Sequence, residues 1–253
     1  MPSPTPAGRN AVGTSSVLAG LTPLIPVPFL DDIVRAYFRR RMVRALAAAH
    51  GQPLGEVDVR ALADAPGRGC VAGCLVAPLW YLLKSVFRKI VLFLEWKRAV
   101  DVASETYHFG RLLEHVLQTG ALAPAGDHEP ARVRQAIDTV LAHRGTSPID
   151  NAVREAFGRS KMTVVAIARG AGAAVRGLGR RRATEQVATA MESVERERAR
   201  EVAGVAAAIE HAVDEVPQGY LEELYRRLDA ELMRDGAVTQ GSSPSAPGPS
   251  GVG

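Results

Sequence analysis

Apolar residues recur at steps of three and four through most of this chain, which is the spacing of helices that bury one face. The region 97–118 shows an apolar stripe opposite a polar one, which predicts a surface helix docked on a core. The apolar stripe contains Val102, Phe109, Leu113, Val116 and Leu117, and the polar stripe contains Asp101, Ser104, His108, Arg111 and His115. No run alternates with the period of two typical of strands. The pattern predicts an all-α protein, an irregular bundle of about six to eight helices with no sheet.

Residues that start or stop helices divide this pattern into elements. Asp31 and Asp32 provide a capping carboxylate and first-turn charge, Gly51 suits a left-handed helix end, and Ser147 precedes a proline at a first helical position. The expected helices are 31–51, 78–96, 97–118, 130–145, one beginning at Pro148, 184–215 and 220–234. In 184–215, apolar residues again follow helical steps, and Arg198 interrupts them, which favours a bundle face over an extended coiled coil.

Both ends of the chain are rich in Pro, Ser and Gly and poor in large apolar residues. We therefore expect a disordered lead at 1–16 and a disordered tail at 236–253. The stretch 121–129 is the best candidate for a boundary between two helical modules, 17–120 and 129–235.

The segment Val71–Trp96 is long enough to span a bilayer, but it contains three cations. Each cation near a bilayer centre costs about 2.5–3.5 kcal/mol, which offsets the gain from the apolar residues. On a helical wheel the cations share one arc and Leu and Phe residues cover the other, as in a helix that lies in the membrane plane. A central core helix whose cations reach solvent is an equally weighted alternative. The candidates for membrane contact are Trp80, Lys84, Phe87, Arg88, Lys89, Phe93 and Trp96.

A second stretch, Arg159–Arg182, has seven basic residues and no acidic one. The candidates for a basic patch are Arg176, Arg180, Arg181 and Arg182. Each cation near an anionic leaflet contributes about 1 kcal/mol of attraction. Phosphates of nucleic acid would attract the same charges, but no zinc spacing or aromatic RNA-binding motif accompanies them. A solvated arginine-rich face is the third interpretation.

Composition adds few constraints. The chain of 253 residues has 31 Lys and Arg against 27 Asp and Glu, a formal net charge of +4, and two cysteines, which fits a reduced cytosolic compartment. The Gly172–Gly177 spacing lacks the Lys-Ser/Thr of a phosphate loop. The Glu-x-x-His spacing of Glu105 and His108 has no second copy for a di-iron site. We therefore expect no catalytic residues, no metal and no cofactor, and so no enzyme.

Four short motifs carry a family likeness. They are Leu-Ile-Pro-Val-Pro-Phe-Leu-Asp-Asp-Ile at 24–33, Arg-Met-Val-Arg-Ala-Leu-Ala from Arg41, His50-Gly51, and Ala-Ser-Glu-Thr-Tyr-His-Phe-Gly at 103–110. Together they resemble the YcjF-type bacterial domain of unknown function over about 20–118. The resemblance implies a helical, non-enzymatic domain on the cytoplasmic face of the inner membrane that often accompanies a GTPase. The chain differs from the family in having His50 in place of a tyrosine and a cation-bearing segment, 79–96, in place of a glycine-rich apolar hairpin.

Three functional hypotheses follow. The first is a non-enzymatic adaptor or scaffold bound peripherally, or integrally if 71–94 crosses the bilayer, to the bacterial inner membrane through an anionic lipid surface. The second is a soluble interaction module in the cytoplasm that binds a protein such as a GTPase through the 184–215 helix. The third, which the lack of motifs disfavours, is a basic nucleic-acid-binding protein.

Overall fold

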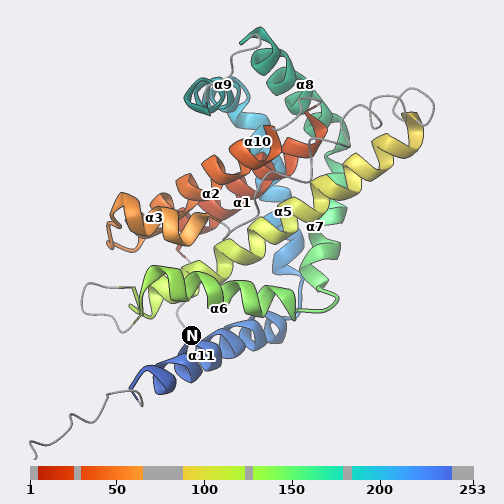
Figure 1. The fold of residues 1–253 in the computed structure, drawn as a ribbon. Helices are drawn as coiled ribbons and strands as arrows, with labels where there is room; N and C mark the ends of the chain where they lie inside the picture. Colours follow the sequence, from red (N-terminus) through yellow and green to blue (C-terminus); the bar gives the residue numbers. More distant parts are fainter. Residues whose placement is uncertain (1–4, 26–29, 65–87, 123–127, 179–183, 241–253) are drawn as a thin grey trace, which may run out of the picture.

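The computed structural model describes residues 5–25, 30–64, 88–122, 128–178 and 184–240 (Figure 1). The helices are α1 (Pro6–Leu21), η1 (Thr22–Leu24), α2 (Leu30–Ala49), α3 (Glu56–Ala63), α5 (Arg88–Gln118), α6 (Pro130–Ala142), α7 (Pro148–Arg159), α8 (Lys161–Gly177), α9 (Thr184–Glu197), α10 (Ala199–Asp214) and α11 (Gln218–Gln240). Strands are absent from the described ranges, which confirms the all-α prediction. Those ranges contain ten α-helices and a short 3-10 turn, more than the six to eight expected.

Helix α1 lies at the centre of the fold, where it packs against α2, α5 and α10. It begins with a complete capping signal, because the Thr5 hydroxyl accepts a hydrogen bond from the Gly8 N–H at 3.0 Å and Pro6 occupies the first helical position. Its buried side chains include Val12, Leu18 and Leu21. The prediction of a disordered lead at 1–16 is therefore wrong for residues 6–16.

Small residues explain how α1, with few large apolar side chains in its first half, becomes a core helix. A Cβ atom on Gly20 would lie 2.8 Å from the Ala103 Cβ and 3.0 Å from the Ala99 carbonyl oxygen of α5. A Cβ on Gly13 would lie 3.3 Å from the Ala206 Cβ of α10. The glycines thus let α5 and α10 approach the α1 backbone closely, and α1 contributes buried surface through its backbone as well as its side chains.

Helix α5 is one continuous element of 31 residues, about 46 Å long, so the boundary predicted between Trp96 and Lys97 does not exist. The prediction of a surface helix over 97–118 is also wrong, because both of its stripes are covered. Four of the five polar-stripe residues are buried, at 8% exposure or less; they are Ser104, His108, Arg111 and His115. The covering elements are α1 on one side and α7 and α11 on others.

The predicted helix 184–215 is two helices, α9 and α10. They meet at Arg198, whose backbone leaves the helical region with φ −108° and ψ 23°, at the position where the apolar steps are interrupted. All six stripe residues are buried within the fold: Val187, Met191, Val194, Val202, Val205 and Ile209. The apolar face that the second hypothesis assigned to a partner is therefore already used in the protein's own core.

Several predicted helix ends are confirmed. The Ser147 hydroxyl accepts a hydrogen bond from the Ile149 N–H at 3.1 Å, with Pro148 at the first helical position, and Gly51 has φ 65° just after α2. Gly145 also has φ 65°, but α6 ends earlier than predicted, at Ala142 with His143 as its cap. Helix α11 continues to Gln240, so the predicted tail at 236–253 begins inside a helix, and residues 241–253 lie outside the described ranges. One buried apolar cluster draws residues from both predicted modules.

Candidate functional site

The amino-terminal end of α5 exposes two large apolar side chains that are neighbours in the sequence. Residues 90–94 read Ile-Val-Leu-Phe-Leu, and five consecutive helical residues occupy positions all round the helix. The two of these whose side chains are described are exposed, Phe93 at 67% and Leu94 at 47%. A helix that is apolar all round belongs in a protein core or in a membrane. This end of α5 projects from the body of the molecule (Figure 1).

One turn further along α5, Trp96 connects this end to the rest of the protein. Its ring meets Phe157 of α7 edge to face, with 6.1 Å between centroids. The Lys161 ammonium of α8 lies 5.7 Å from the centroid of the same ring, within range of a cation–π contact. Val100, one turn beyond, is already buried. The transition from core to exposed apolar surface therefore takes place within about one turn on either side of Trp96.

The structure brings together some of the predicted membrane-contact residues. Phe93 and Trp96 lie on α5, and Arg88 and Lys89 form its first turn. Trp80, Lys84 and Phe87 lie outside the described residues, so the predicted in-plane helix is described only from Arg88 onward. Among the helices that are described, none has the length and apolar character needed to cross a bilayer.

Sequence reasoning missed the neighbourhood of Lys161 and Met162. Met162 is 81% exposed, the most exposed large apolar side chain described, and it follows directly on the lysine that contacts Trp96. A methionine inside a basic run was the available signal. Of the predicted basic patch, Arg176 is exposed on α8, whereas Arg180, Arg181 and Arg182 lie outside the described residues.

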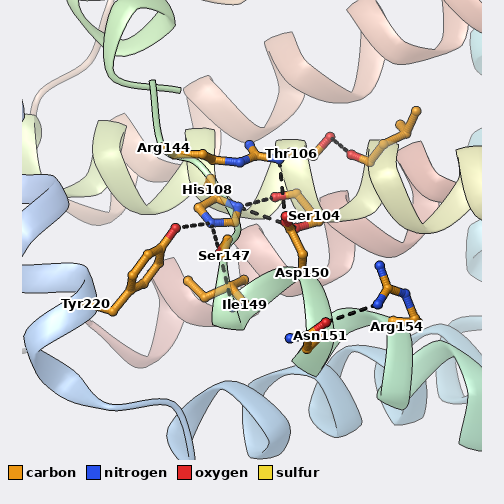
Figure 2. A network of polar contacts seen from close by, with 11 residues as sticks. Ser104, Thr106, His108, Arg144, Ser147, Ile149, Asp150, Asn151, Arg154 and Tyr220 are labelled. Carbon is orange, nitrogen blue, oxygen red and sulfur yellow. Dashed lines mark hydrogen bonds and ion pairs between the residues drawn. The ribbon is translucent and has the colours of Figure 1, made fainter. Parts of the chain in front are cut away.

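A different kind of cluster lies in the interior, around His108 of α5 (Figure 2). His108 Nδ1 lies 2.7 Å from the Ser104 carbonyl oxygen, one turn earlier in the same helix. Its Nε2 faces two hydroxyls, that of Ser147 at 2.8 Å and that of Tyr220 at 3.2 Å. The Ser104 hydroxyl donates to the Asp150 carboxylate. The cluster thus joins α5 to the start of α7 and to α11.

Burial lowers the pKa of His108 to about 4, assisted by the positive charge of Arg144 and opposed by the Ser104 carbonyl and by Asp150. The ring is therefore neutral at pH 7. Because its Nδ1–H donates to the Ser104 carbonyl, Nε2 is the acceptor for the neighbouring hydroxyls.

A serine hydrogen-bonded to a neutral histidine has the geometry of an activated nucleophile. Here, however, Ser147 has no exposed surface, and its oxygen also accepts the α7 capping hydrogen bond from Ile149. The arrangement can hold helices together but offers a substrate no approach to the serine oxygen. Sequence reasoning placed His108 on a solvent-facing stripe and so did not find this cluster.

A second buried polar cluster holds the start of α1. The Glu114 carboxylate of α5 forms an ion pair with the Arg111 guanidinium, with 2.9 Å between Oε2 and Nη1. Its other oxygen lies 3.8 Å from His50 Nε2. A Cβ atom on Gly8 would collide with this carboxylate, so α1 begins directly against it. Burial raises the pKa of Glu114, and the charges of Arg111 and His50 oppose that rise. A negative group at a helix amino terminus stabilises the helix.

In the part of the chain that the structure describes, no three His, Cys, Asp or Glu side chains gather closely enough to hold a metal ion. Comparisons with models of protein families, with curated proteins and with solved structures found no match for this chain.

Proposed function

We propose that this chain is a non-enzymatic helical protein that binds peripherally to an anionic membrane surface through the amino-terminal end of α5, as an adaptor or scaffold on the cytoplasmic side of the bacterial inner membrane. The observation that carries the proposal is the exposure of Phe93 and Leu94 within a helix segment that is apolar on every side. Removing one such side chain from water contributes about 1.5–3 kcal/mol. A membrane boundary would take up the exposed side chains of Phe93 and Leu94.

Charge favours a lipid surface over an apolar protein groove. From residue 65 to residue 94 the sequence contains no Asp or Glu and four cations, Arg68, Lys84, Arg88 and Lys89. Lys97 and Lys161 are exposed near the same end of α5. Glu95 follows Leu94 directly, and at about 1 kcal/mol for each cation close to an anionic leaflet the exposed Lys97 and Lys161 would add to the apolar contribution.

The buried Ser147–His108 pair supports the non-enzymatic part of the proposal. The Ser147–His108 pair is the arrangement of described side chains closest to a catalytic one, and it is closed to solvent and engaged in capping. The likeness of residues 20–118 to the YcjF-type domain supports both the membrane and the non-enzymatic assignment. A GTPase or other protein partner remains an alternative, with the α5 end rather than the buried α9–α10 stripe as its contact.

Co-sedimentation of the full chain with lipid vesicles tests the proposal. The vesicles are phosphatidylcholine alone or mixed with phosphatidylglycerol, at low and high salt. We expect binding that needs phosphatidylglycerol and weakens with salt. The double variant Phe93→Asp, Leu94→Asp removes two apolar contacts and adds two negative charges, so its binding falls at least about a hundredfold.

The matched control is Val57→Asp on α3, which places the same charge on another exposed apolar residue (79% exposed). This variant should bind vesicles as the wild type does. If the wild type stays in the supernatant with every vesicle composition at low salt, the membrane assignment is wrong. If Val57→Asp and the α5 double variant lose binding equally, the α5 end is not the contact.

A further inference from the structure

The corner between α7 and α8 lies against the same end of α5. Helix α7 ends at Arg159 and α8 begins at Lys161, with only Ser160 between them. Phe157, near the end of α7, packs edge to face on the Trp96 ring. The Lys161 ammonium, at the start of α8, lies 5.7 Å from the centroid of the same ring. The exposed Met162 therefore lies next to a residue that touches α5 one turn from Phe93.

These contacts join the corner to α5 at Trp96. Phe157 is fully buried, and Val164 and Ile167 anchor the first two turns of α8 in the core. The carboxyl-terminal part of α5 is likewise embedded, from Ala99 and Val100 onward. The α5 helix is therefore held by the core from Trp96 onward, next to the corner.

The chemistry of the corner complements that of an anionic bilayer. Met162 presents a long apolar side chain that is 81% exposed. Lys161 is exposed, and no carboxylate in the described ranges forms an ion pair with it; its ammonium lies over the Trp96 ring. The nearby Arg159 is, by contrast, paired with Glu155 of its own helix. A cation beside an indole suits the headgroup level, where tryptophan rings accumulate.

We propose that the α7–α8 corner is the second contact of the membrane face: Met162 enters the apolar boundary and Lys161 binds the phosphate of an anionic lipid headgroup beside Trp96. This inference rests on the proposed function and extends it from one helix end to a composite surface of Phe93, Leu94, Trp96, Lys161 and Met162. A second contact next to the α5 end would restrict the orientation of the protein on the membrane more than the helix end alone.

The test measures vesicle partitioning of the full-length variants Met162→Asp and Lys161→Glu. Their matched controls are Met233→Asp and Arg226→Glu on α11, which packs near the other end of α5 (Figure 1); Met233 is 75% exposed and the Arg226 side chain 76%. We expect partitioning to fall about tenfold or more for each corner variant with phosphatidylglycerol-containing vesicles, and to stay within about twofold of the wild type for each control. The thermal unfolding of all four is expected to be close to that of the wild type, because the substituted side chains are exposed.

The outcomes separate the two proposals. If Phe93→Asp, Leu94→Asp abolishes binding while both corner variants bind like the wild type, the corner is not a contact and the proposed function stands. If Lys161→Glu weakens binding to vesicles of phosphatidylcholine alone as much as binding to vesicles that contain phosphatidylglycerol, Lys161 does not bind an anionic headgroup. Its proposed role is then overturned. If the wild type binds no protein-free vesicle, this inference fails together with the proposed function.

Discussion

Helix α1 is more buried, and the amino-terminal end of α5 more exposed, than their amino-acid compositions would predict. Residues 6–16 of α1 are mostly Ala, Gly, Ser and other small or polar residues, yet they lie at the centre of the fold. Residues 90–94 of α5 are an unbroken run of large apolar residues, yet Phe93 and Leu94 are exposed. In α1 the close approach of α5 and α10 to Gly20 and Gly13 accompanies burial, whereas in α5 two large apolar side chains stay exposed.

The two regions also differ in how their ends are held. The start of α1 is fixed by its Thr5 cap and by Glu114, which comes from a helix more than 100 residues away in the sequence. On α5, Trp96 contacts Phe157 of α7 and Lys161 of α8. Neighbouring exposed apolar side chains such as Phe93 and Leu94 are common at interaction surfaces.

The largest test of this contrast compares two leucines. Leu18 of α1 is 1% exposed and Leu94 of α5 is 47% exposed. We expect Leu18→Ala to lower the free energy of unfolding by about 2–5 kcal/mol, because it leaves a cavity in the core. Leu94→Ala should change it by less than about 0.5 kcal/mol. Urea unfolding followed by circular dichroism measures both, and equal losses would mean that the α5 end is part of the core.

A second test uses pH to probe the buried part of α5, around His108. The folded pKa of His108, about 4, lies below its ordinary value of 6.5, so the unfolded chain binds more protons between these values. Stability from this group is thus complete above pH 6.5 and is lost as the pH falls to 4, by about 3 kcal/mol. The groups that face the ring are Ser104, Ser147, Tyr220, Asp150, Arg144 and Glu105.

The variant His108→Gln isolates this contribution. Glu114 and Glu210 have pKa values raised by burial and favour folding at low pH, so the total profile is a sum of opposite effects. These effects are shared by the wild type and the variant and cancel in their difference. Unfolding measured from pH 7 to pH 4 should therefore show a flatter decline for His108→Gln. Parallel profiles would show that the ring is not held neutral.

The third and smallest test uses glycines. In Gly20→Ala the new methyl would lie 2.8 Å from the Ala103 Cβ and 3.0 Å from a backbone oxygen, so we expect a net loss of about 1–2 kcal/mol despite the better helix propensity of alanine. Gly204 of α10 has open space around the same position. Gly204→Ala should gain about 0.5–1 kcal/mol. Thermal unfolding distinguishes them by the sign of the change in Tm.

The sequence was sufficient to predict the class of fold and many helix ends, because these depend on local chemistry. The serine–proline signal at 147–148 and the interruption at Arg198 both correspond to real boundaries. The same signal at Thr5 and Pro6 begins α1, although the Pro-, Ser- and Gly-rich composition around it is typical of disorder. The buried polar stripe of α5 could not be predicted from periodicity, because its partners, Ser147, Asp150 and Tyr220, lie 39 to 112 residues away from His108 or Ser104.

Only part of the candidate membrane face could be predicted from the sequence. The apolar run and its cations are local, so Phe93 and Trp96 were identified from the sequence. Met162 and Lys161 reach α5 only through tertiary packing. Their proximity to Trp96 follows from the way α7 turns into α8 at Ser160, which no local pattern specifies.

Quenching of Trp96 fluorescence by lipids brominated in their acyl chains tests the central claim most directly. The chain has two tryptophans, so in the variant Trp80→Phe all indole emission comes from Trp96. We predict that vesicles of brominated phosphatidylglycerol quench this emission, and that Phe93→Asp, Leu94→Asp in the same background removes the quenching. Emission that is unchanged by brominated vesicles at saturating lipid would contradict the account, because the α5 end would then not lie at a lipid surface.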